Sequence, residues 1–164
     1  FEGKNIDDIL NMTIDDAVEH FSIHQQDKIV NKLKPLQDVG LGYVALGQSS
    51  STLSGGEAQR IKLASFLVKG HTKEKALFIF DEPTTGLHFH DIKKLLKSFD
   101  ELIDKGHSVI VIEHNMELVK CADYIIDLGL EGGDKGGTLV VEGTPEEIIK
   151  NKESYTAKYV KEKL

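Results

Sequence analysis

Apolar residues in the first part of the chain recur every three or four positions, which is the spacing of one buried helix face. The pattern predicts helices that begin after Thr13, extend over 25–39 and extend over 57–68. Thr13 suits a helix N-cap, and Asp16 stands three residues later in a capping-box position. We therefore expect residues 1–72 to form a mainly helical subdomain.

The second part of the chain, residues 73–164, contains short continuous apolar runs instead. The runs "ALFIF" (76–80) and "SVIVI" (108–112) are typical of strands that are covered on both faces of a parallel sheet. An amphipathic helical stripe begins near Ile92 between them, and "YIIDLG" predicts a third strand. Strands that alternate with helices indicate an α/β fold of the doubly wound type.

The last part of the chain has clear turn and cap residues. "GGDKGG" (132–137) predicts a hairpin turn, and "TLVVEG" (138–143) predicts the edge strand that follows it. Thr144 and Pro145 are a helix cap followed by the proline that is favoured at the first helical position.

The charge of the chain limits its partners. With 20 lysine and arginine residues against 27 aspartate and glutamate residues, the net charge is -7. A surface that coats nucleic acid would be basic, so the net charge argues against general coating but does not exclude a local basic patch. No apolar run reaches membrane-spanning length, and no basic-then-apolar leader precedes the first helix. We expect a cytoplasmic protein without a membrane partner.

Zinc is not expected in this chain. Cys121 is the single cysteine, so neither a disulfide within the chain nor a Cys-based zinc site can form. His88 and His90 form a His-x-His pair, but no third ligand at a matching spacing stands nearby, and metal sites need three or four ligands.

A small-residue turn, Ser54-Gly55-Gly56, stands directly before the third predicted helix. The free N–H groups and the dipole of a helix start favour a phosphate, and glycines allow its close approach. An ordinary capped helix explains the same residues equally well.

Two adjacent carboxylates, Asp81 and Glu82, follow the first predicted strand, and His114 follows the second. Ligands bind α/β sheets at the carboxyl ends of the strands, so the three side chains are expected at one rim. One acid can hold Mg²⁺, usually through water, while its neighbour orients an attacking water. The imidazole could hydrogen-bond a phosphate oxygen. Taken singly, each residue is also compatible with a solvated loop or a helix cap.

Three motifs combine these features in one order: "LSGGEAQR" (53–60), "LFIFDEPTTGL" (77–87) and "VIVIEH" (109–114). In this order and at these separations, they resemble the ABC-type ATPases. The resemblance implies a partial ABC-type ATPase domain of the α/β class. In it, a helical signature subdomain precedes the Walker B half of a mostly parallel sheet flanked by helices.

The same resemblance implies roles for the residues that match the motifs. The signature loop would contact, in trans, a nucleotide held by another module, and the Walker B acid, catalytic glutamate, D-loop and switch histidine would serve the site of their own module. The residues that match the signature loop are Ser54, Gly55, Gly56 and Glu57. Asp81 matches the Walker B acid that holds Mg²⁺, and Glu82 matches the catalytic glutamate. The D-loop is matched by Thr84, Thr85 and Gly86, and the switch histidine by His114.

Longer stretches resemble the UvrA family, the DNA-damage-recognition ATPases of bacterial excinuclease ABC. They are residues 3–21, residues 33–64, "DEPTTGLH" (81–88) and "GGTLVVEGTPEEI" (136–148). The resemblance implies ATP and Mg²⁺ as cofactors, a homodimer of the intact protein, and damaged double-stranded DNA and the UvrB subunit as partners. It places the segment at the C-terminal end of the second nucleotide-binding module, after a zinc-binding insertion.

The chain contains no Gly-x-x-x-x-Gly-Lys-Ser/Thr sequence, so the β- and γ-phosphates have no cradle. We therefore interpret it as a piece of a longer protein whose Walker A-bearing remainder is its first partner. Alone, it is expected to be inactive toward ATP. A non-catalytic coupling module of another ABC-type DNA-maintenance protein is the alternative, although the long coiled coil that marks such proteins is not present in this sequence.

Overall fold

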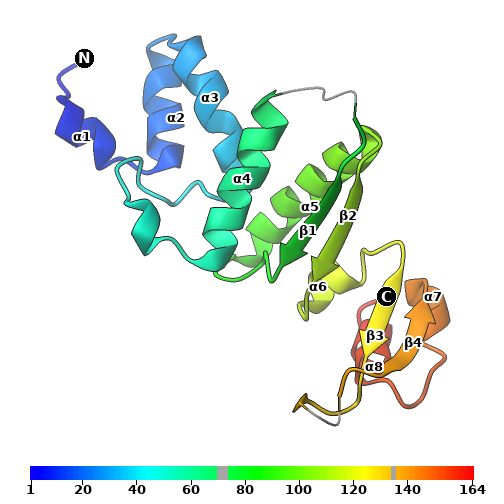
Figure 1. Ribbon diagram of the computed structural model, residues 1–164. Helices are drawn as coiled ribbons and strands as arrows, with labels where there is room; N and C mark the ends of the chain where they lie inside the picture. The colour runs from blue at the N-terminus through cyan, green and yellow to red at the C-terminus, as the bar shows by residue number, and fades with distance from the viewer. Residues whose placement is uncertain (70–73, 134–135) are drawn as a thin grey trace. The chain divides into compact units, whose positions relative to one another are not determined.

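The computed structural model describes residues 1–69, 74–133 and 136–164 (Figure 1). The chain divides into two compact units, Phe1–Ile112 and Glu113–Leu164. The boundary predicted between residues 72 and 73 lies outside the described residues and stays a prediction.

The first unit carries helices before and between two strands. In chain order, its elements are α1 (Ile6–Leu10), α2 (Ile14–Ile23), α3 (Asp27–Asp38), η1 (Ser50–Thr52), α4 (Gly55–Lys69), β1 (Leu77–Asp81), α5 (Phe89–Asp104) and β2 (Ser108–Ile112). Thr13 caps α2 as predicted, because its Oγ1 accepts a hydrogen bond from the N–H of Asp16 at 3.1 Å. The interleaved helices and parallel strands confirm the predicted α/β class.

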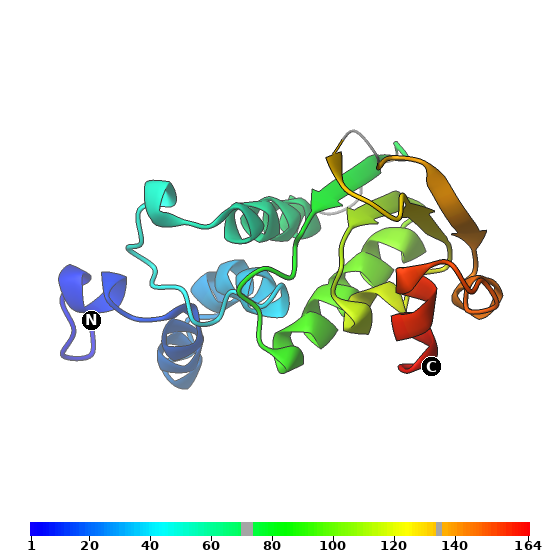
Figure 2. The same cartoon turned by 90° about the horizontal axis from the view of Figure 1, so that it is seen from below.

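Strands β1 and β2 pair in parallel, with Leu77 opposite Ser108 and Asp81 opposite Ile112. Helix α5 covers one face of this sheet (Figures 1 and 2), and the rings of Phe80 and Phe99 lie 4.9 Å apart between their centroids. The ring of Phe66 in α4 packs edge-to-face on the ring of Phe78 in β1, with 4.6 Å between the ring centroids, and this contact attaches α4 to the same strand.

The other face of this sheet departs from the prediction that both faces are covered. Its apolar side chains are between 50% and 63% exposed: Leu77, Ile79, Ile110 and Ile112. The continuous apolar runs indicate that both faces of the sheet need to be covered. The described residues of this unit cover only one of the two faces.

The second unit contains α6 (Met116–Val119), β3 (Ile125–Leu128), β4 (Leu139–Gly143), α7 (Pro145–Ile148) and α8 (Tyr155–Lys161). Strand β3, expected in the parallel sheet, pairs antiparallel with β4 instead, with Ile125 opposite Gly143. A short connection allows antiparallel pairing, whereas a parallel neighbour needs a long crossover. The predicted hairpin turn includes residues 134–135, which lie outside the described residues. The predicted cap at Thr144 and Pro145 is confirmed.

Glu117 in α6 is held by two lysines, with Lys120 Nζ at 2.7 Å and Lys163 Nζ at 2.8 Å from its carboxylate oxygens. Hydrogen bonds from Lys120 and then from Lys163 lower the pKa of Glu117 from its ordinary value of 4.5 to about 2. Because the folded-state pKa is depressed, the charged form stabilises this unit above pH 4.5, and the contribution is lost as the pH falls toward 2.

We expect Glu117→Gln to lower the urea midpoint at pH 7, and the difference from wild type to shrink as the pH falls below 4.5. Urea denaturation from pH 7 downward measures both. Glu153→Gln is the matched control, because its exposed side chain lies in the same unit. A difference between Glu117→Gln and wild type that did not change with pH would contradict the role of this ion pair.

Candidate functional site

The signature loop is closed by a capping box at the start of α4. Ser54 Oγ accepts a hydrogen bond from the N–H of Glu57 at 3.2 Å, and Glu57 Oε2 accepts one from the N–H of Ser54 at 2.7 Å. The side chain of Ser54 and the backbone of Gly55 are exposed where the helix begins. Exposed N–H groups at a helix start can bind an anion.

The two glycines of this loop lie in different surroundings. A Cβ atom added at Gly55 would meet nothing within 4 Å. One added at buried Gly56 would lie 3.2 Å from a guanidinium nitrogen of Arg60, and 3.4 Å from the carbonyl oxygens of Glu82 and Thr85. Gly56 therefore allows α4 to approach the turn after β1, whereas Gly55 faces open space.

Asp81 ends β1 and is held by the side-chain amide of Gln59 from α4. Gln59 Nε2 donates to the carbonyl oxygen of Asp81 at 3.0 Å, and the N–H of Asp81 donates to Gln59 Oε1 at 3.1 Å. The backbone of Asp81 is thus fixed from the side that β2 does not pair, while its side chain stays exposed.

Glu82 has a positive φ of 47°, a backbone region that residues other than glycine rarely occupy. Its N–H donates to the carbonyl of Ile112 at 2.9 Å, and its carbonyl accepts from the N–H of Thr85 at 3.1 Å. Strained backbone of this kind gathers at functional sites, where the surrounding contacts hold it. The adjacent carboxylates of Asp81 and Glu82 thereby belong to different backbone conformations, which suits two separate roles.

The D-loop is fixed from α4 by Arg60, whose side chain is 0% exposed. Its Nη1 donates to the carbonyl oxygens of Pro83 at 2.5 Å and Thr85 at 3.3 Å. Thr84 between them is buried, while Thr85 and Gly86 are exposed. Burial lowers the pKa of the Arg60 guanidinium, which nevertheless stays charged because its ordinary pKa is so high.

Tyr43, in the loop after α3, connects the signature loop to Arg60. Its hydroxyl donates to Glu57 Oε1 at 2.7 Å and accepts from Arg60 Nη2 at 3.3 Å. Burial and the hydrogen bond to Glu57 raise the pKa of Tyr43, and the bond from Tyr43 lowers the pKa of Glu57. Tyr43, Gln59 and Arg60 were not predicted from the sequence as site residues.

His114 belongs to the second unit and follows β2 by two residues. It is exposed, and its backbone N–H donates to Glu113 Oε2 at 2.9 Å. The structure therefore brings together the signature loop, the Walker B acids and the D-loop within the first unit. The expected roles of these residues and of His114 stay predictions.

The carboxylate of Asp81 is exposed at the end of β1. Within the described residues, no group of three or more His, Cys, Asp and Glu side chains is placed to hold a metal by itself. Mg²⁺ in phosphate-transfer sites is commonly bound through one or two carboxylates together with phosphates and waters. The exposed Asp81 carboxylate fits that pattern.

Among the helices of the described ranges, none has the length and hydrophobicity that a membrane crossing requires.

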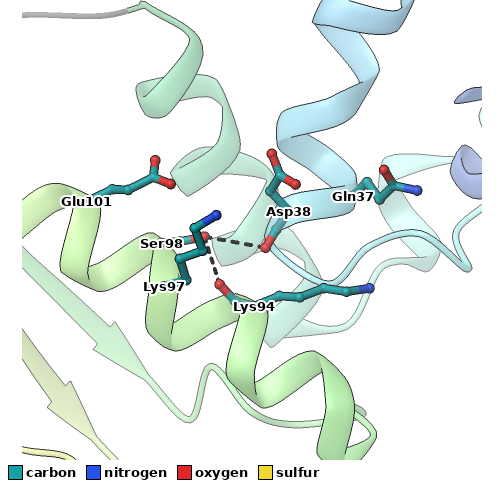
Figure 3. Close-up of a pocket in the computed structure, with 6 residues that line it drawn as sticks. All are labelled: Gln37, Asp38, Lys94, Lys97, Ser98 and Glu101. Carbon is teal, nitrogen blue, oxygen red and sulfur yellow. Dashed lines mark hydrogen bonds between the residues drawn. The ribbon is translucent and has the colours of Figure 1, made fainter.

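A shallow hollow lies between α3 and α5 and contains none of the motif residues (Figure 3). Ser98 Oγ donates there to the carbonyl oxygens of Lys94 at 3.1 Å and Asp38 at 3.4 Å. These bonds join the two helices. The remaining lining side chains are the neutral Gln37 and four charged ones of both signs: Asp38, Lys94, Lys97 and Glu101.

The α/β fold, with its helices and parallel strands interleaved, matches the partial ABC-type ATPase domain that the sequence predicts. No family model matches it. Over all 164 residues, it is 60% identical to UvrABC system protein A of Clostridium perfringens and 56% identical to that of Aquifex aeolicus. The similarity to UvrA predicted from the sequence is thereby confirmed. The chain spans 17% of the length of these relatives.

The structure matches the crystal structure of UvrA2 from Deinococcus radiodurans with a TM-score of 0.81 and 42% sequence identity. The match covers the whole of this chain and 20% of the crystallised one. The fold is therefore that of a segment of a UvrA-type protein.

Proposed function

We propose that the chain is the C-terminal part of a nucleotide-binding module in a UvrA-type ATPase. In the intact protein, the module couples ATP binding and hydrolysis to recognition of damaged DNA in nucleotide excision repair. The observation that carries this proposal is the attachment of the signature helix to the Walker B end. Gln59 holds the backbone of Asp81, and Arg60 holds the turn after Glu82.

Each motif residue has a part in this proposal. Phosphoryl transfer depends on positioning and on stabilisation of charge, so the protein supplies contacts rather than covalent chemistry. Asp81 holds Mg²⁺ through water, Glu82 orients the attacking water, and His114 hydrogen-bonds the γ-phosphate. The signature loop contacts the nucleotide of the other module through Ser54, Gly55, Gly56 and Glu57. The D-loop lies beside the signature loop and consists of Thr84, Thr85 and Gly86.

The partners follow from the same assignment. The Walker A-bearing remainder of the protein supplies the phosphate cradle, and the exposed apolar face of the β1–β2 sheet is a surface on which it can pack. A second copy of the intact protein, damaged double-stranded DNA and the UvrB subunit are the further partners. The 164 residues alone are expected to bind ATP weakly and not to hydrolyse it.

Gly55→Asp in the full-length protein tests the contact of the signature loop with phosphate. A side chain at Gly55 meets nothing in its own module, so the new carboxylate acts on the nucleotide of the other module. Two like charges about 4 Å apart repel by several kcal/mol in a partly solvated site, so kcat for ATP hydrolysis should fall at least about tenfold. Steady-state ATPase assays measure the loss.

Two controls separate this effect from a damaged helix. Gly55→Ala adds volume without charge and is expected to change kcat less than about twofold. A carboxylate in the first turn of a helix stabilises it, so the melting temperature of Gly55→Asp should not fall. Unchanged ATP hydrolysis in Gly55→Asp would overturn the proposed contact in trans.

A further inference from the structure

We infer that Tyr43 is a positioning residue that couples the two ATP sites of the proposed ATPase. It transmits the state of the signature loop, which meets one nucleotide, to the turn at Glu82 and Thr85, which serves the other. This inference rests on the proposed function, and it concerns a residue outside all three motifs.

The hydroxyl of Tyr43 makes hydrogen bonds both to the signature loop and to Arg60. It donates to Glu57 Oε1 at 2.7 Å and accepts from Arg60 Nη2 at 3.3 Å. A phenol hydroxyl offers one proton to donate, and here that proton is given to a carboxylate. Both partners of this hydroxyl are charged groups, and hydrogen bonds to ionised partners are stronger than those between neutral groups.

On the signature side, one carboxylate joins the loop to Tyr43. Glu57 Oε2 accepts from the N–H of Ser54, the residue that opens the signature loop, while Oε1 accepts from Tyr43. A phosphate that draws the N–H groups of this loop toward itself therefore moves the carboxylate that Tyr43 binds.

On the hydrolysis side, Arg60 holds the turn that follows the catalytic glutamate. Its Nη1 donates to the carbonyls of Pro83 and Thr85, and the N–H of Thr85 donates back to the carbonyl of Glu82. Glu82 has the positive φ that such contacts must maintain. A shift of the guanidinium thus reaches the backbone of Glu82 through one intervening turn.

Tyr43 is not needed to attach α4 to the sheet. Gln59 binds both backbone groups of Asp81, and Phe66 packs on Phe78. Tyr43 is 46% exposed, so it packs only partly against its neighbours.

The loop that carries Tyr43 is fixed in place. The carbonyl of Gly42 accepts from the N–H of Asp15 in α2, and any side chain at Gly42 would overlap the Asp15 carboxylate. That carboxylate in turn accepts from Gln37 Nε2 at 2.7 Å. The backbone on either side of Tyr43 is therefore hydrogen-bonded to the start of α2, through Gly42 and Val44.

Tyr43→Phe in the full-length protein removes the hydroxyl alone. We expect kcat for ATP hydrolysis to fall about fivefold, the size expected for one or two lost hydrogen bonds, and KM for ATP to change less than about twofold. The phosphates of the hydrolysed ATP are held elsewhere, so binding is spared. Tyr155→Phe, at an exposed tyrosine of the second unit, is the matched control and should leave both constants unchanged.

Combining Tyr43→Phe with Gly55→Asp tests whether Tyr43 couples the signature loop to the Glu82 turn or only stabilises that turn. If Tyr43 reports the state of the signature loop, Tyr43→Phe should lower kcat about fivefold in wild type and have little effect where the loop cannot close. The same fivefold loss in both backgrounds, or no loss in wild type, would overturn the coupling role and leave the proposed function intact. If Gly55→Asp itself left hydrolysis unchanged, the proposed contact in trans would fail, and the coupling with it.

Discussion

Replacing Glu82 with glutamine in the full-length protein should lower kcat for ATP hydrolysis about a hundredfold or more while ATP still binds. Glutamine keeps the size of the side chain but cannot accept the proton or hold the negative charge that orients the attacking water. The neighbouring Asp81 carboxylate stays in place, because Gln59 binds the Asp81 backbone and not Glu82. The site that uses this Walker B should therefore retain its nucleotide without cleaving it.

Single-turnover hydrolysis and binding of labelled ATP, both in the full-length protein, measure the two halves of this prediction. Glu101→Gln removes an equal charge from the exposed face of α5 and serves as the control. Loss of ATP binding in Glu82→Gln would mean that Glu82 helps to hold the nucleotide or its metal, and its assignment to catalysis would then be wrong.

The apolar pattern predicted the positions of the strands in the sequence, but not what covers them or how they pair. Both strands of the parallel sheet appear where continuous apolar runs predicted them, because such runs report the need for burial. The same runs do not say which part of a protein supplies the cover, and Ile79 and Ile110 are half exposed or more in this chain. Nor does a run reveal its pairing direction, so β3 was assigned to the parallel sheet although it pairs with β4.

The motif residues could be placed from the sequence because each stands at the end of a strand or the start of a helix. The side chains that join them could not, because their contacts cross 14 to 25 residues of sequence. One signal was available for Arg60. It stands four residues after Gly56 and three and four before Leu63 and Ala64, on the buried stripe of α4. A charged residue on a buried stripe is rare and indicates a specific partner.

Arg60→Met should destabilise the protein by about 2–4 kcal/mol, because it removes the donors of two carbonyl oxygens while it keeps the apolar stem. Arg60 is fully buried, and its guanidinium meets Pro83, Thr85 and Tyr43. Replacing a whole buried polar network with apolar groups can be harmless, but here the acceptors are backbone and cannot be replaced. The carbonyl of Pro83, a fully buried residue, loses its donor and cannot readily be solvated in its place.

Urea denaturation of Arg60→Met, Arg60→Lys and Lys62→Met measures this cost. Lys62 lies two residues further along α4 and is exposed, so Lys62→Met controls for the change of charge and should shift stability by less than about 0.5 kcal/mol. Lysine has no planar fork and cannot bind the Pro83 carbonyl and the Tyr43 hydroxyl in the same geometry, so Arg60→Lys should fall between the two. If Arg60→Met were as stable as Lys62→Met, the D-loop would not depend on α4. The turn after Glu82 would then have to be held by its own backbone hydrogen bonds alone.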